Sequence, residues 1–139
     1  MSFSHEALNL TNDKNLVYTA MSKHLFYYRM HISKYVIEQH GVPLNPFMIF
    51  DCFLLDSVNR DLVREGNNNL VKRADEIWVF GPVSNGVLVE IKIGASLKKL
   101  IRYFKIEKSN KITPISVQEV EMEDEVRSLN RNYPWINLG

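Results

Sequence analysis

Residues 74–91 read ADEIWVFGPVSNGVLVEI, and they decide the fold because two structures fit them. The first part, 76–81, is apolar and rich in β-branched and aromatic residues, which is typical of a buried strand. After it, Asn85-Gly86 is a strong turn signal, and the residue types over 87–93 then alternate as they do along a strand. One interpretation of this stretch is therefore a β-hairpin.

The other interpretation is a strand, a loop and a helix. In it the helix runs from Gly86 to Lys98 and turns Leu88, Ile91, Ala95 and Leu97 toward a sheet. Strand and helix patterns alternate elsewhere in the chain, and parallel strands need crossover helices between them. We therefore favour the strand–loop–helix interpretation.

The flanking sequence extends the alternation of strands and helices. We expect a three-layer α/β domain with a mainly parallel sheet of four or five strands. The expected strands are 16–21, a short proline-broken edge strand within 42–47, 76–81, 99–106 and 112–120. The expected helices run from an N-cap at Ser22 to His40 with Gly41 as the stop, from a cap at Asp56 or Ser57 to Arg73, and over 121–130.

Length and composition set the broad class of protein. The 139 residues fit an N-terminal arm over 1–13 and a single domain over 14–139. A hydrophobic content of 45% excludes a disordered chain, and a net charge of +1 argues against a protein that coats nucleic acid polymers. Since no apolar run could cross a bilayer and the N-terminus lacks a secretory core, we expect a cytoplasmic protein without membrane contact.

The sequence predicts neither a disulfide nor a metal site. Cys52 is the only cysteine, so it cannot form an internal disulfide or a cysteine-rich zinc site. His24, His31 and His40 lack the spacing of a zinc-binding helix, and we predict no metal site. The aromatic tail over 133–136 is expected to dock on the domain or on a second subunit.

One pattern within these elements resembles a known family. Ala74-Asp75, the apolar strand, and then Ser84, Gly86 and Glu90 at the start of a helix resemble the signature of the nucleoside 2-deoxyribosyltransferase-like superfamily. That group includes the deoxynucleoside-monophosphate N-glycosidases. The similarity extends over about 15–106. It implies a flavodoxin-like sandwich with a ligand at the carboxyl ends of the strands.

The resemblance also implies roles for individual residues. Glu90 would be the catalytic nucleophile, because a carboxylate can trap the oxocarbenium-like sugar that forms when an N-glycosidic bond breaks. Ser84 and Gly86 would position the 5′ end of the substrate at the helix start, and Tyr18 would hold the sugar. The position of the family's sugar-binding aspartate falls on Asn67, and Asp61 is the alternative carboxylate.

The function implied by the resemblance is that of a nucleoside or nucleotide N-glycosidase or 2-deoxyribosyltransferase. Its partner is a small-molecule nucleoside or nucleotide, no cofactor is needed, and the family favours a homodimer or higher homo-oligomer. The alternative is a non-catalytic nucleotide-binding or sensing module of the same fold. A structural domain that assembles through its aromatic tail is a third hypothesis.

Overall fold

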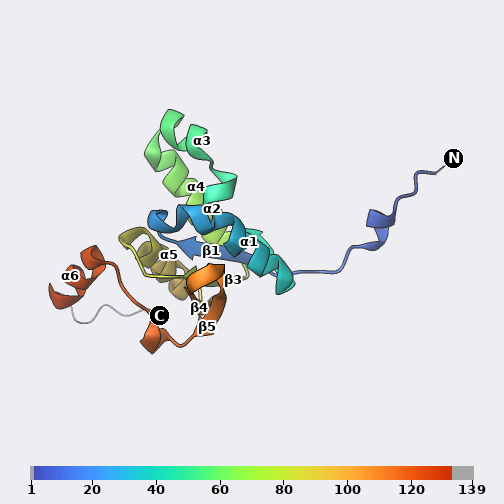
Figure 1. Cartoon of the computed structure of the whole chain (residues 1–139). Coiled ribbons are helices and arrows are strands. Elements are labelled where there is room, and N and C mark those ends of the chain that lie inside the picture. The colour runs from blue at the N-terminus through green and yellow to red at the C-terminus, as the bar shows by residue number, and fades with distance from the viewer. Residues whose placement is uncertain (1, 133–139) are drawn as a thin grey trace.

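The computed structural model describes residues 2–132 (Figure 1). The aromatic tail over 133–136 lies outside the described residues, so its expected docking stays a prediction. Residues 2–15 are exposed, and Figure 1 shows this segment running away from the sheet. Its last residue, Asn15, accepts the Val42 N–H with its carbonyl and donates its side-chain amide to Glu76. Within this segment lies a short 3₁₀ helix, Glu6–Asn9.

Five strands form one sheet in the order β2-β1-β3-β4-β5. Their bounds are β1 (Leu16–Met21), β2 (Val42–Leu44), β3 (Glu76–Phe80), β4 (Leu100–Ile106) and β5 (Ile112–Ile115). β1 pairs in parallel with β2 and β3, β3 pairs in parallel with β4, and β5 is antiparallel to β4. The mainly parallel sheet predicted from the sequence is thus confirmed. The strand order reverses between β1 and β3, where open α/β sheets of this kind bind their ligands.

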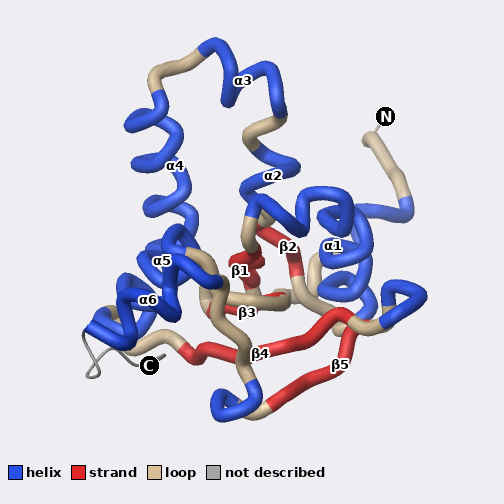
Figure 2. The backbone as a smooth tube through the Cα atoms, turned by 60° about the vertical axis from the view of Figure 1, so that its left-hand side comes forward, coloured by secondary structure: helices blue, strands red, loops and turns tan. Residues whose placement is uncertain are grey.

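Helices cover both faces of the sheet (Figure 2). The α-helices are α1 (Arg29–Glu38), α2 (Pro46–Ile49), α3 (Cys52–Ser57), α4 (Arg60–Arg73), α5 (Asn85–Ser96) and α6 (Asp124–Asn132), and the further 3₁₀ helices are Lys23–Tyr28, Lys108–Asn110 and Val117–Glu119. Together they make a flavodoxin-like three-layer sandwich.

Alternation along the strands divides the core into two layers. Tyr18 and Ile77 pack on the side of α4 and α5, in one buried cluster with Val71 of α4 and Ile91 of α5. Their neighbours Val17 and Trp78 face the other way and pack against α1. Each strand between helical layers therefore buries both of its faces.

Residues 85–96 are helical, so the hairpin interpretation is wrong. Ser84 is the N-cap, and Asn85 and Gly86 are the first two helical residues instead of a turn. The inward face consists of Val87, Leu88, Ile91 and Gly94. Leu97, which we expected to face the sheet, follows the helix and is exposed.

Other boundaries also differ from the prediction. The segment after Ser22 is a 3₁₀ helix followed by α1, and the residue with positive φ behind α1 is His40 instead of Gly41. α4 is capped by Asn59, whose side-chain oxygen accepts the Asp61 N–H at 2.8 Å, and neither Asp56 nor Ser57 is its cap. The last strand ends at Ile115, and α6 begins at Asp124.

Candidate functional site

A cavity of about 750 Å³ lies at the carboxyl ends of β1 and β3. Four parts of the chain form most of its wall: the end of β1 with the start of the 3₁₀ helix that follows it, the first three turns of α4, the start of α5, and the start of α6 with the residue before it. In that order they contribute Met21, Ser22, Lys23 and His24; Arg60, Arg64, Asn67 and Asn68; Ser84, Gly86, Val87, Val89 and Glu90; and Glu123 and Glu125. Pro46 and Phe47 of α2 complete the lining.

Glu90 brings a carboxyl group to this cavity from the second turn of α5. The residue is partly buried, and its carboxyl oxygen Oε2 accepts a hydrogen bond from the Tyr18 hydroxyl of β1. Burial of the carboxyl group raises the pKa of Glu90 to about 8, because removal from water disfavours the charged form. The fold thus pairs two residues that are 72 positions apart in the sequence.

The start of α5 is held by two side-chain acceptors. Ser84 Oγ accepts the Val87 N–H at 3.3 Å, as an N-cap does. Glu125 Oε1 accepts the Asn85 N–H at 3.0 Å from the other end of the sequence. Gly86 is open: a Cβ atom built on it would meet only Ser84 Oγ, at 4.0 Å. A ligand can therefore approach the backbone of α5 at this residue.

The wall from α4 carries an amide without a partner. The side-chain oxygen of Asn67 is buried and has no hydrogen-bond partner among residues 2–132. A buried acceptor left unpaired costs about 1–3 kcal/mol, so a donor from a bound molecule at this position would be stabilising. Asn67 is thus placed to accept a hydrogen bond inside the cavity.

Two predicted site residues do not line the cavity: Tyr18, which is fully buried and contacts the carboxyl group of Glu90 through its hydroxyl, and Asp61. The Asp61 side chain is exposed and pairs with Arg64 at 3.0 Å. The residues of α4 that do line the cavity follow one helical face, at positions 60, 64, 67 and 68. Asp61 is one residue away from the start of that stripe, which turns it toward solvent. Asp61, the alternative carboxylate of the sequence analysis, therefore lies outside the cavity and forms an exposed ion pair.

A family model described as "Domain of unknown function (DUF7768)" matches residues 17–104. The chain belongs to this family. The matched residues include most of β1 and of β4 and the whole of α4, β3 and α5, so they contain both Tyr18 and Glu90. No curated protein matches the sequence.

Two solved structures are similar to this DUF7768 member. The 2-deoxyribosyltransferase from Bacillus psychrosaccharolyticus aligns with a TM-score of 0.57 and 12% identity, over 88% of this chain and 96% of that one. A 2-desoxiribosyltransferase from Leishmania mexicana aligns with a TM-score of 0.53 and 14% identity, over 86% and 98%. This DUF7768 chain therefore has the nucleoside 2-deoxyribosyltransferase-like fold, as the sequence resemblance predicts.

Sequence reasoning missed several residues that line the cavity. Arg60 and Arg64 had no local signal beyond their shared face of α4. Glu123 and Glu125 lie in an acidic stretch that is typical of a solvated helix start, but their partners His24 and Asn85 are 99 and 40 positions away. Such contacts follow from the tertiary structure of the DUF7768 chain and not from local pattern.

Two kinds of feature are absent from the described part of the chain. Within residues 2–132, no helix is both long and apolar enough to span a membrane. The same residues contain no group of three or more His, Cys, Asp or Glu side chains placed to hold a metal ion.

Proposed function

We propose that this protein breaks the N-glycosidic bond of a nucleoside or nucleotide, with Glu90 as the nucleophile. The observation that carries the proposal is the position of Glu90. Its carboxyl group lines the cavity at the strand-order reversal and accepts the hydroxyl of Tyr18. A carboxyl group withdrawn from water but facing a cavity has little structural use, and burial of this kind is typical of catalytic groups.

The proposed reaction has two steps. In the first, a carboxylate oxygen of Glu90 forms a bond to C1′ of the sugar while the bond from C1′ to the base nitrogen breaks. The electron pair of that bond leaves with the base, which takes a proton from solvent. In the second step, water or another base attacks C1′, and the ester to Glu90 is released. Water gives a hydrolase and a second base gives a transferase.

Neighbouring residues would hold the sugar during both steps. Tyr18 fixes the carboxyl group of Glu90 through its hydroxyl hydrogen bond. The unpartnered oxygen of Asn67 would accept a hydrogen bond from a sugar hydroxyl. Ser84 and the open backbone at Gly86 would position the 5′ end. The similar folds of two 2-deoxyribosyltransferases support the same substrate class.

Release of free base tests the proposal. The purified protein is incubated with the common nucleosides and their 5′-monophosphates, and the products are separated by chromatography. We expect free base to appear, and we expect Glu90→Gln to abolish its release while Glu65→Gln, an exposed carboxyl group on α4, has no effect. Base release by Glu90→Gln at the wild-type rate would contradict the assignment.

One observation favours a second candidate, a non-catalytic nucleotide-binding or sensing module. A pKa of about 8 keeps Glu90 largely protonated at neutral pH, and a protonated carboxyl group does not attack C1′. Such a module would be stabilised by a nucleoside or nucleotide through mass action without releasing base. A rise in Tm on ligand addition, with no free base over the same range of pH, would favour it.

Assembly and location remain separate predictions of the sequence. We propose a homodimer or higher homo-oligomer, and sedimentation of the purified protein measures its mass directly. We also propose a cytoplasmic location, which imaging of a tagged full chain would test.

A further inference from the structure

We propose that Glu123 and Glu125 act as specificity-determining residues, which make the cavity select a free 5′-hydroxyl and reject a 5′-phosphate. We refer to these two residues as the acidic wall. The inference rests on the proposed function and narrows its substrate class from nucleosides and nucleotides to nucleosides. The basis is the contact of the acidic wall with the start of α5, where the substrate's 5′ end would lie.

The start of a helix normally attracts anions, because its first N–H groups lack partners and its dipole is positive there. In this protein a carboxylate of the chain already occupies that position. Glu125 Oε1 accepts the Asn85 N–H at 3.0 Å, at the first residue of α5. A phosphate approaching the same N–H group would have to displace Glu125 or lie beside it with like charge.

Backbone hydrogen bonds also hold the acidic wall in place, in addition to the contacts of its side chains. The Val83 N–H donates to the Glu121 carbonyl at 2.9 Å, and the Glu123 N–H donates to the Val83 carbonyl at 2.9 Å. Three residues after Glu123, Val126 is fully buried. The segment before α6 is therefore fixed against the loop that leads into α5, with the acidic wall beside the helix start.

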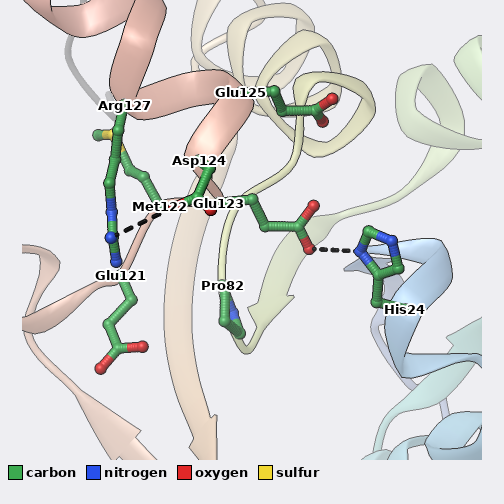
Figure 3. Close-up of a pocket in the computed structure, with 8 residues that line it drawn as sticks. All are labelled: His24, Pro82, Glu121, Met122, Glu123, Asp124, Glu125 and Arg127. Carbon is green, nitrogen blue, oxygen red and sulfur yellow. Dashed lines mark hydrogen bonds and ion pairs between the residues drawn. The ribbon is translucent and has the colours of Figure 1, made fainter.

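Glu123 forms the second part of the acidic wall. Its side chain is only 16% exposed, and its Oε2 lies 3.1 Å from Nδ1 of His24, in the turn after β1. Figure 3 shows the side chains of Glu123 and Glu125 extending toward the side on which His24 lies, whereas Glu121 extends elsewhere. Both side chains of the acidic wall line the cavity that contains Glu90.

The geometry of α5 places the 5′ end of a sugar near the acidic wall. Gly86 and Glu90 are four residues apart and share one face of the helix, about 6 Å from each other along its axis. That is about the reach from C1′ of a pentose to its 5′ oxygen. With C1′ at Glu90, the 5′ oxygen lies at the helix start. A hydroxyl there donates to a carboxylate, whereas a phosphate dianion is repelled by it.

The opposite wall offers the competing explanation. Arg60 and Arg64 of α4 line the same cavity, and guanidinium groups bind phosphate well. Arg64 already pairs with Asp61 at 3.0 Å. If a nucleotide bound with its phosphate on these arginines, the protein would prefer nucleotides and the acidic wall would be irrelevant to selection.

The test compares the four 2′-deoxynucleosides with their 5′-monophosphates as substrates by kcat/KM for base release, and as ligands by calorimetry. The wild-type protein should prefer the nucleosides in both measurements. Glu125→Gln keeps an acceptor for the Asn85 N–H but removes the charge, and should reduce the preference about tenfold. The double variant Glu123→Gln/Glu125→Gln should reduce it further.

Asp124→Asn is the matched control. Asp124 lies between Glu123 and Glu125 in the sequence, and its substitution removes one negative charge, as Glu125→Gln does. Its side chain, however, is fully exposed and does not line the cavity. The substitution should leave the preference unchanged.

Two results would overturn the inference: a wild-type preference for nucleotides that Arg60→Gln abolishes, or a nucleoside preference that the double variant retains in full. Binding that shows the expected preference without any base release would overturn the proposed reaction and leave this inference standing. If neither class of compound bound, both would be overturned.

Discussion

Glu90 and Tyr18 form the hydrogen-bonded pair at the centre of the proposed site. Glutamate side chains are ordinarily exposed to solvent, because burial of a charged carboxyl group is costly. Here the carboxyl group receives the Tyr18 hydroxyl and faces a cavity, and burial raises its pKa to about 8. Glu90 should therefore lose its proton near pH 8, and this titration has two measurable consequences.

The first consequence concerns stability. The pKa of Glu90 is about 8 in the folded state, above its ordinary value of 4.5, so the folded protein retains a proton that the unfolded chain loses. The free energy of unfolding should therefore fall as pH rises between these two values. Glu90→Gln removes the titration. We expect the free energy of unfolding of wild type to fall by roughly 2–4 kcal/mol relative to that of Glu90→Gln as the pH rises from 5 to 8.5. Denaturant unfolding measures both. Parallel pH profiles of the two proteins would contradict this.

The second consequence concerns activity. Only the ionised form of Glu90 can attack, so kcat/KM for base release should rise with pH up to about 8 and then level off. Tyr18→Phe removes the donor that favours the carboxylate. We expect its rising limb to move to higher pH, with about tenfold lower kcat/KM at pH 7 and partial recovery at pH 9. Tyr35→Phe, on the opposite face of the sheet, is the control and should leave the profile in place.

At the scale of the element, α5 shows where local pattern is insufficient. The residue types over 87–93 satisfy the period of a strand as well as a helix, and Asn85-Gly86 favours a turn. The helix forms because Ser84 caps it and because Val87, Leu88, Ile91 and Gly94 can all be buried against the sheet at once. The order of the surrounding strands favoured this outcome, but packing decides it.

Two glycines of α5 allow a matched test of the cavity. At Gly86 a Cβ atom has open space, so Gly86→Ala should stabilise the helix by up to about 1 kcal/mol. The methyl group would project to where we propose that the 5′ end lies, and we expect kcat/KM to fall about tenfold. At Gly94 a Cβ atom would lie 2.9 Å from Ile77 Cγ1, so Gly94→Ala should destabilise the protein. Equal effects of the two changes on Tm would contradict this assignment.

For the whole molecule, the buried strands were predictable and the assembly of the site was predictable only in part. Apolar runs identified β1 and β3 because a strand covered on both faces is nearly all apolar. Leu100, Tyr103 and Phe104 indicated β4, although that strand is partly exposed. Ser84, Gly86 and Glu90 could be placed together because they are close in sequence. Their distant neighbours could not: Asp61 turned out to be external, and the acidic wall enters the cavity through contacts that no local spacing records.

The reaction that we propose requires a covalent bond between Glu90 and the sugar. The most direct measurement is mass spectrometry of the protein after incubation with a 2′-fluoro-2′-deoxy-arabino nucleoside, whose fluorine slows the second step and lets the intermediate accumulate. We predict an increase in mass equal to one fluorinated pentosyl group, located by peptide mapping on Glu90 and lost in Glu90→Gln. Base release with no adduct, or with an adduct on a residue other than Glu90, would show that Glu90 is not the nucleophile.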